Sequence, residues 1–196
     1  KICNGEYPAA GFGLTEPEAG SDASALCTTA VLRGDHWILN GRKIFITSGA
    51  YAGIFIIWAV VDKEAPRGEG IGAFLVEPEF AGFVVGKDEE KMGQLGSAAN
   101  ELVMEDCRVP RENLLGDVSN GYRIAVSELA GGRIGIGSMA LGIGLAAMDY
   151  AKEYAKERVQ FGRPIAEFQA IQWKLADRYT ELEAARLLLL QAAHLK

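Results

Sequence analysis

The sequence predicts an α+β protein, in which an antiparallel β-barrel or sandwich is followed by long antiparallel helices of an incomplete helical bundle. Two observations support this class. Short apolar runs alternate with Gly, Asn and Asp turn signals up to about residue 117, which is typical of antiparallel sheets. Beyond residue 119, apolar residues recur at the spacing of a helix. We therefore expect a β-domain over residues 1–118 and helices over residues 119–196.

Seven short apolar runs are expected to form the strands of the β-domain. The dipeptide Asn40-Gly41 lies between two of these runs and is the strongest hairpin signal in the chain. The runs span residues 28–32, 37–39, 43–47, 54–61, 71–76, 83–86 and 102–104.

The first helix is expected to run from Ser119, which can serve as its N-cap, to about Arg158. Six glycines lie inside it, and each costs up to about 1 kcal/mol of helix propensity relative to alanine. One interpretation is a break near Gly131-Gly132. We favour a continuous helix whose bare backbone face lies against another helix or a ligand, because alanines keep the same stretch small and helix-forming. The small residues are Gly131, Gly132, Gly135, Gly137, Gly142, Gly144, Ala140, Ala146 and Ala147.

A short connection over residues 160–164 leads to a second helix that continues to the end of the chain. Its last turns, residues 187–190, are apolar on almost every side, which is typical of a helix inside a bundle. We expect the missing partner helices in a segment outside residues 1–196 or in another subunit. One apolar stripe consists of Phe168, Ile171, Leu175, Tyr179, Leu182, Ala185 and Leu189.

The composition, 49% hydrophobic and 23% charged residues, is typical of a globular protein. The net charge is −6 and the basic residues are scattered, which argues against nucleic acid or an anionic membrane as a partner. The longest uncharged run, residues 134–148, is shorter than the roughly 20 residues of a membrane span, so we expect a buried helix segment there.

The cysteines Cys3, Cys27 and Cys107 are odd in number and have no paired spacing, which predicts reduced thiols in an intracellular compartment. His36 and His194 have no ligand pattern around them, and we expect no metal site. The chain begins without a methionine or a leader peptide, which indicates an internal segment of a longer protein.

A turn-rich loop over residues 14–22 is the first candidate for ligand binding. Pro17 fixes φ, Gly20 allows close approach of the backbone, and Thr15 and Ser21 offer hydroxyl groups. Such a loop can hydrogen-bond a planar heterocycle or a phosphate. A plain structural turn is the alternative interpretation.

The strand over residues 43–47 is the second candidate. Alternation places Phe45 and Thr47 on one face and Ile46 on the other. An aromatic ring and a hydroxyl on one face suit a flat ligand with ring heteroatoms. An edge strand with a core phenylalanine is the alternative.

These two segments and several shorter motifs together resemble the acyl-CoA dehydrogenase family, in family order and over nearly the whole chain. The segment 132–136 is most similar to the short-chain (butyryl-CoA) branch. The resemblance implies an N-terminal helical domain, a central β-domain and a C-terminal four-helix bundle, of which this chain would hold the second and half of the third. The shorter motifs are Lys91-Met92-Gly93, Gly96-Ser97, Val109-Pro110, Asn113-Leu114-Leu115-Gly116, Arg158-Val159-Gln160-Phe161-Gly162 and Phe168-Gln169.

The resemblance implies FAD as the cofactor. Phe45, Ile46 and Thr47 would pack on the isoalloxazine ring, and Thr47 would donate a hydrogen bond toward flavin N5. Thr15 would lie near the pyrimidine edge of the ring. The rest of the flavin site would be lined by Phe12, Leu14, Gly20 and Ser21.

Further roles follow from the resemblance. Arg158, Phe161 and Gln169 would reach the FAD of a neighbouring subunit. Arg158 would pair with its pyrophosphate, because the planar guanidinium matches phosphate oxygens; a helix-terminal cation that offsets the helix dipole is the alternative. Ser21 and Arg133 would contact the acyl-CoA substrate.

The implied reaction is α,β-dehydrogenation of an acyl-CoA thioester to the trans-2-enoyl-CoA, with electrons passed to an electron-transfer flavoprotein. A homotetramer in the bacterial cytoplasm, or in the mitochondrial matrix of a eukaryote, would carry it out. The general base would be a glutamate beyond Lys196, because the position that a minority branch uses is Gly132 here. Glu16 and Glu128 match no base position of the family. Three residues depart from frequent family residues: Ala130 from aspartate, Phe45 from tryptophan and Ser48 from asparagine.

Two alternatives stand beside this reading. An acyl-CoA oxidase or a flavin monooxygenase would use the same scaffold to reduce oxygen. A non-enzymatic relative would act as a binding protein, for instance on DNA, and the lack of a basic patch argues against it.

Overall fold

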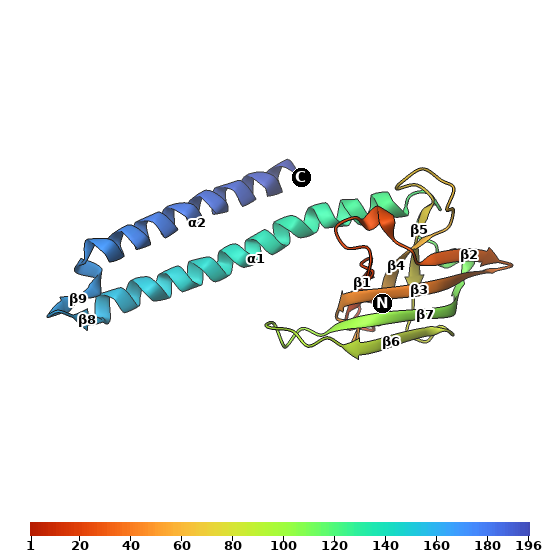
Figure 1. Ribbon diagram of the computed structural model, residues 1–196, viewed down its shortest axis with the longest axis horizontal. Helices are drawn as coiled ribbons and strands as arrows, with labels where there is room; N and C mark the ends of the chain where they lie inside the picture. Colours follow the sequence, from red (N-terminus) through yellow and green to blue (C-terminus); the bar gives the residue numbers. More distant parts are fainter. The chain divides into compact units, whose positions relative to one another are not determined.

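Seven strands form one curled sheet in the first part of the chain (Figure 1). The computed structural model describes residues 1–196, in two units that span Lys1–Val126 and Ser127–Lys196. The strand order is β1-β4-β2-β3-β7-β6, and β5 pairs with β4. The strands are β1 (Ala10–Gly13), β2 (Thr29–Arg33), β3 (His36–Thr47), β4 (Ile54–Val60), β5 (Ile71–Val76), β6 (Phe83–Asp88) and β7 (Ala99–Pro110).

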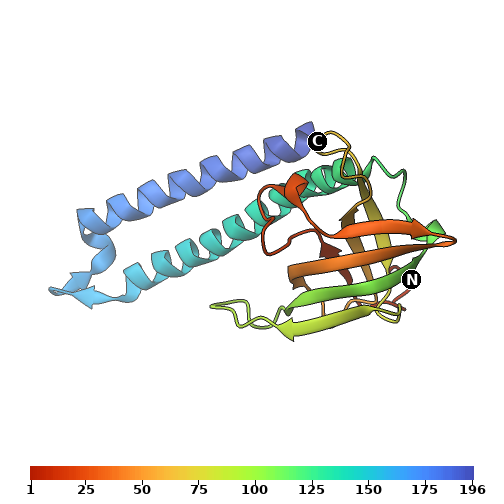
Figure 2. The same ribbon diagram turned by 45° about the vertical axis from the view of Figure 1, so that its right-hand side comes forward.

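The sheet is mixed, because β4 runs parallel to two of its neighbours. It pairs with β1 from Ala10↔Ile54 to Gly13↔Ile57, and it meets β2 at Thr29↔Val60. All other pairings are antiparallel, and Figure 2 shows β2, β3, β7 and β6 side by side in one layer. The predicted α+β class is confirmed, with a curled mixed sheet in place of a purely antiparallel one.

The predicted hairpin at Asn40-Gly41 is wrong, because β3 continues straight through these residues. The β3–β7 pairing shifts register there, which identifies a β-bulge. The Asn40 side chain exchanges two hydrogen bonds with Asp106 on β7, at 3.0 and 2.8 Å. At Gly41, a Cβ atom would lie 2.4 Å from the Thr28 hydroxyl. Asn40 therefore binds the bulge of β7, and Gly41 allows Thr28 to approach the backbone of β3 closely.

The hairpin between β2 and β3 turns instead at Gly34-Asp35, where Arg33 pairs with His36. Gly34 has a φ of 64°, a left-handed conformation that glycine adopts without a steric penalty. The sequence also predicts a short strand at residues 102–104, and the structure extends it into the twelve-residue β7, which pairs with β3 and β6.

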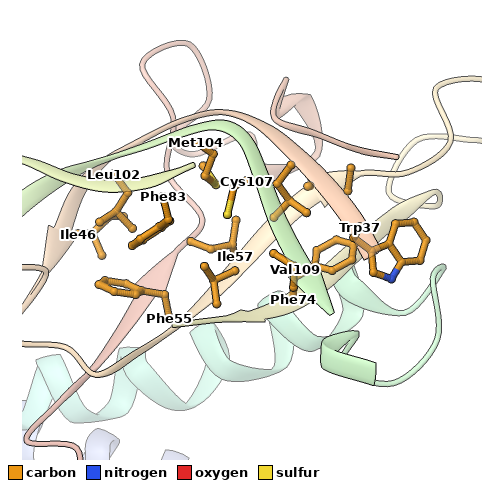
Figure 3. Packing of buried hydrophobic residues seen from close by; sticks show 14 of the residues in the cluster. Trp37, Ile46, Phe55, Ile57, Phe74, Phe83, Leu102, Met104, Cys107 and Val109 are labelled. Atoms are coloured by element: carbon orange, nitrogen blue, oxygen red, sulfur yellow. The ribbon is translucent and has the colours of Figure 1, made fainter. Parts of the chain in front are cut away.

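Aromatic and aliphatic side chains from β2 to β7, inside the curled sheet, form the main core (Figure 3). Phe55 and Phe83 pack with ring centroids 5.0 Å apart, and Trp37 meets Phe74 edge-to-face at 5.2 Å. Cys107 is fully buried in this cluster, and burial raises the pKa of its thiol to about 11.

A second hydrophobic cluster joins the sheet to the first turn of helix α1 (Gly121–Glu157). Trp58 of β4 is fully buried there, and Ala125 of the helix packs into the same cluster. Gly121 itself approaches β5 so closely that a Cβ atom would lie 2.4 Å from the carbonyl oxygen of Ile71. The helix can begin here because its first residue has no side chain.

Helix α1 is continuous over its 37 residues, so the interpretation with a break at Gly131-Gly132 is wrong. With Ser119 as the predicted N-cap the helix would begin at residue 120, and it begins one residue later, at Gly121. In the second unit, a Cβ at Gly137 or Gly144 would lie 2.7 Å from Leu189 or Leu182, so part of the glycine-bearing face does contact another helix.

That second helix is α2 (Gln169–Leu195), which runs antiparallel to α1 in the second unit (Figure 1). The two helices are joined by the hairpin β8 (Val159–Gln160) and β9 (Arg163–Pro164) and by a short 3₁₀ turn, Ile165–Glu167. The unit boundary at Val126 falls inside α1, and the domain boundary expected at residues 118 and 119 stays a prediction.

The apolar surfaces of the helices are open to solvent in this chain. Leu187, Leu188 and Leu190 are each more than half exposed. By length and hydropathy alone α1 meets the criterion for a membrane span, a criterion that core helices of soluble proteins also meet.

Candidate functional site

The loop over residues 14–22 lies directly against β3, so the two segments that sequence analysis singles out are neighbours in space. The backbone N–H of Ile44 donates to the carbonyl oxygen of Thr15 at 3.0 Å. The ammonium group of Lys43 donates to the carbonyl oxygen of Leu14 at 3.2 Å. β1 delivers the chain to this loop, and Phe12 on β1 packs on Trp58 with centroids 4.4 Å apart.

Glu16 and Lys43 form an ion pair inside this junction. The Lys43 nitrogen lies 2.7 Å from the Glu16 carboxylate, and the two side chains are 0% and 5% exposed for Lys43 and Glu16, respectively. The same carboxylate accepts the backbone N–H groups of Cys27 at 2.6 Å and Thr28 at 3.0 Å. These bonds make Glu16 a structural anchor of the loop.

Burial and charge have opposite effects on the two groups of this pair. Burial lowers the pKa of Lys43 to about 8, and the nearby Glu16 carboxylate offsets part of that change. Burial acts to raise the pKa of Glu16, but the charge and hydrogen bond of Lys43, together with the hydrogen bonds from Thr28 and Cys27, lower this pKa by more.

The end of β3 carries a β-bulge and a left-handed backbone. Lys43 faces Leu102 of β7 and Ile46 faces Asn100, so β3 holds one extra residue in this interval. Phe45, inside the bulge, has a φ of 58°, and Ser48, just beyond the strand, has a φ of 62°. Such backbone is rare for residues other than glycine, and it concentrates at ligand sites.

The bulge presents two predicted site residues to solvent. Phe45 is 62% exposed and Thr47 is exposed, whereas Ile46 is buried in the main core (Figure 3). The alternative of a core phenylalanine is wrong, because Phe45 lies outside the core, although β3 pairs only with β7 over residues 43–47. The side chain of Ile46 cannot stack on a ligand from this position, so only its backbone is available for one.

The predicted residues of the loop divide in the same way. Gly20 and Ser21 are exposed and Thr15 is half-buried, so their polar groups are accessible. Leu14 is buried in the second cluster and offers a ligand its backbone alone. The turn is closed by paired backbone hydrogen bonds between Glu16 and Ala19, at 2.9 and 3.2 Å.

Two side chains that sequence reasoning missed hold the ends of these segments. Asn100 of β7, 3% exposed, accepts the N–H of Ala50 at 2.8 Å and so supports the turn after Thr47. Arg67 forms an ion pair with Asp22 at the end of the loop and donates to the Ser24 hydroxyl at 2.7 Å. The ion pair of Glu16 and Lys43 was not predicted either. The only signal for it in the sequence is that the two candidate segments carry opposite charges.

The second unit carries the other predicted site residues. Phe161 is 94% exposed at the tip of the β8–β9 hairpin, where it and Gly162 have φ angles of 51° and 79°. Both angles match a type I′ turn. Arg158 directly follows the last residue of α1 and is exposed, as are Gln169 and Arg133.

The first-unit site is suited to binding a flat heteroaromatic molecule. It offers an exposed ring at Phe45, hydroxyls at Thr15, Ser21 and Thr47, and an exposed glycine at Gly20. The carboxylate within it, Glu16, is fully engaged. The site can therefore hold and orient a ring, and its proton chemistry must come from another group.

Family models match most of the chain. The model described as acyl-CoA dehydrogenase, middle domain, matches residues 11–107, and the model described as acyl-CoA dehydrogenase, C-terminal domain, matches residues 119–196. A short-chain specific acyl-CoA dehydrogenase of Clostridium acetobutylicum is 49% identical over 94% of this chain and 48% of its own length. The chain thus spans about half the length of this relative.

Solved structures give the same picture. One, of an electron transferring flavoprotein of Acidaminococcus fermentans, matches with a TM-score of 0.91 and 52% identity over 95% of this chain and 49% of that chain. Another, an acyl-CoA dehydrogenase complexed with FAD from Bacillus anthracis, matches with a TM-score of 0.82 and 41% identity over 89% of this chain and 30% of that chain. The fold and the family models therefore agree.

Proposed function

The chain belongs to the acyl-CoA dehydrogenase family, and from this premise we propose that it supplies the flavin-binding region of an enzyme that oxidises short-chain acyl-CoA thioesters to trans-2-enoyl-CoA. One observation carries the proposal. The Thr15 carbonyl binds the Ile44 N–H, and this bond brings the hydroxyl-bearing loop beside the exposed Phe45 and Thr47.

The cofactor in this proposal is FAD, which accepts the hydride when bound. Phe45 would pack against the ring system, and the Thr15, Ser21 and Thr47 hydroxyls would hydrogen-bond its heteroatoms. The donor set fits such a ring because these groups are accessible and uncharged. The bulge would hold Phe45 in its strained backbone before the cofactor arrives, which limits the ordering that binding requires.

Arg158, Phe161 and Gln169 would act on the FAD of a neighbouring subunit in a homotetramer. The exposed ring at the hairpin tip has few contacts in its own chain, with Phe168 at 6.1 Å between centroids. An arginine that is exposed at the end of α1 can direct its planar guanidinium to a pyrophosphate. Stabilisation of the α1 carbonyl end remains its role if no phosphate is bound.

Substrate binding in this proposal involves Ser21 and Arg133, both exposed. Removal of the α-proton needs a carboxylate, and we assign it to a residue outside residues 1–196. Gly132 has no side chain, and the Glu16 carboxylate is already bound by Lys43 and two backbone N–H groups. The electrons would pass to an electron-transfer flavoprotein, and the bacterial relatives point to the cytoplasm as the location.

The test is anaerobic reduction of the FAD-loaded full-length protein by butyryl-CoA, followed by admission of air. We expect bleaching of the flavin absorbance and slow reoxidation. Thr47→Ala should slow the reductive step by at least about ten-fold, the rate equivalent of one ordinary net hydrogen bond. Thr180→Ala is the matched control, because its hydroxyl bonds to Ala176 within α2.

Other outcomes select the alternatives. Fast reoxidation with peroxide release would identify an oxidase, and an oxygenated product would identify a monooxygenase. A protein that binds no FAD, is not reduced by any acyl-CoA and binds DNA at physiological salt would be the non-enzymatic relative.

A further inference from the structure

The Glu16–Lys43 pair joins three separate segments at one buried point. The carboxylate of Glu16, in the 14–22 loop, accepts a hydrogen bond from the ammonium group of Lys43 on β3. It also accepts the backbone N–H groups of Cys27 and Thr28, which lead into β2. Lys43 adds a bond to the carbonyl of Leu14. The loop is therefore tied on both sides, to the strand before the bulge and to the start of another.

Stability alone does not explain a pair of this kind. Removing two charges from water is costly, and apolar side chains of similar volume often serve a buried position equally well or better. Lys43 has no exposed surface at all, and Glu16 has almost none. The pair also fixes the relative placement of the segments that it joins, because its hydrogen bonds require defined partners and angles, whereas apolar contacts do not.

The pair lies where the 14–22 loop meets the bulge of β3, so these are the two segments that it places. Lys43 is the last paired residue before the bulge, and pairing resumes at Ile46. The adjacent residue, Ile44, donates to the Thr15 carbonyl. The pair thus lies between the Thr15 hydroxyl on the loop side and the Phe45–Thr47 segment on the strand side.

We propose that Glu16 and Lys43 are positioning residues of the flavin site, a buried ionic clamp that sets the placement of Thr15 relative to Phe45 and Thr47. This inference rests on the proposed function for its ligand. The clamp itself touches no reacting atom. It holds the loop and the bulge in the arrangement in which their hydroxyls and ring face one ligand.

The test compares two double variants of the full-length protein. Glu16→Met/Lys43→Met removes the clamp and leaves no unpaired charge. Asp149→Asn/Lys152→Met removes an exposed pair of 3.0 Å on α1 and is the control. Two quantities are measured: the FAD dissociation constant, by titration of the apoprotein, and amide hydrogen exchange of peptides covering residues 42–47 and residues 54–60.

We expect the clamp variant to weaken FAD binding by at least about ten-fold, because the ligand must then order the loop itself. Exchange at residues 42–47 should accelerate, while β4 at residues 54–60 stays protected. The control should match the wild type in both quantities. Lys43→Met alone should show the same local acceleration and a larger loss of FAD affinity.

Two results would overturn the inference. One is wild-type FAD affinity and exchange in the clamp variant. The other is equal acceleration in β4, or a variant that does not fold, since the pair would then be a general element of the core. If the wild-type protein binds no FAD, the proposed function fails, and the exchange data still decide whether the clamp positions the loop.

Discussion

The indole nitrogen of Trp58 donates a 2.7 Å hydrogen bond to the carbonyl oxygen of Gly121, the first residue of α1. Trp58 is fully buried, so this bond lies in an apolar environment where an unmade bond is costly. It fixes the start of the long helix on β4 by a directional contact as well as by packing.

Replacement of Trp58 by phenylalanine should lower the free energy of unfolding by about 2–4 kcal/mol, from the lost bond and the smaller ring. Trp37→Phe is the matched control, since that indole is also buried but its nitrogen has no partner. The free energy of unfolding should fall clearly less in Trp37→Phe than in Trp58→Phe. Urea unfolding of both variants measures the difference, and equal losses would show that the bond to Gly121 contributes nothing.

Gly121→Ala should destabilise the protein by more than about 2 kcal/mol, because the added methyl group meets backbone atoms that cannot rotate away. Those atoms include the Ile71 carbonyl oxygen at 2.4 Å. Gly96→Ala, at a site with nothing within 4 Å and an ordinary φ, should stay within about 0.5 kcal/mol of the wild type. Thermal unfolding of the two variants side by side is sufficient.

Phe45→Asn should stabilise the apoprotein by about 1 kcal/mol while it weakens flavin binding. Asparagine tolerates the left-handed backbone that costs a phenylalanine about 1–2 kcal/mol, and the exposed ring has little packing to lose. Tyr51→Asn changes an exposed aromatic without a positive φ and should give no gain. A loss of stability at Phe45 would show that the bulge is not strained.

The stability contribution of Lys43 should depend on pH in a defined direction. Its folded-state pKa of about 8 lies below the ordinary 10.5, so between these values the unfolded chain holds a proton that the folded chain has released. By linkage, the free energy of unfolding then rises with pH. Relative to Lys43→Met, the wild type should gain stability as the pH rises from about 8 to 10.5.

Urea unfolding at intervals from about pH 7 to pH 10.5 measures this difference. Lys63→Met, which removes an exposed lysine, corrects for the general effect of alkali. A wild-type advantage that shrinks as the pH rises would contradict the prediction.

The sequence predicted the β-then-α order well, because alternation and helical spacing are local properties. It failed at Asn40-Gly41, since a bulge and a hairpin favour the same residues and only the partner strand, through Asp106, decides between them. The loop and the strand of the site were both identified, but their adjacency depends on a hydrogen bond between residues 15 and 44.

Lys43 was missed for a similar reason. Strict alternation groups it with Phe45 and Thr47 on one face, and an outward lysine is the ordinary expectation. The bulge breaks that alternation, so Lys43 is buried while the other two are exposed. The same shift buries Ile46, which the family resemblance had assigned to the ring. Register irregularities arise from tertiary pairing, which a single sequence does not display.

The three thiols of the chain will differ sharply in their reaction with maleimides. Cys3 and Cys27 are exposed, whereas Cys107 is buried and its raised pKa keeps it in the unreactive protonated form. A label will therefore react at Cys3 and Cys27. The rate at which Cys107 reacts will report how often β7 opens. Because the backbone of Cys27 binds Glu16, a fluorophore on that sulfur will sit next to the clamp and can follow its loosening in real time.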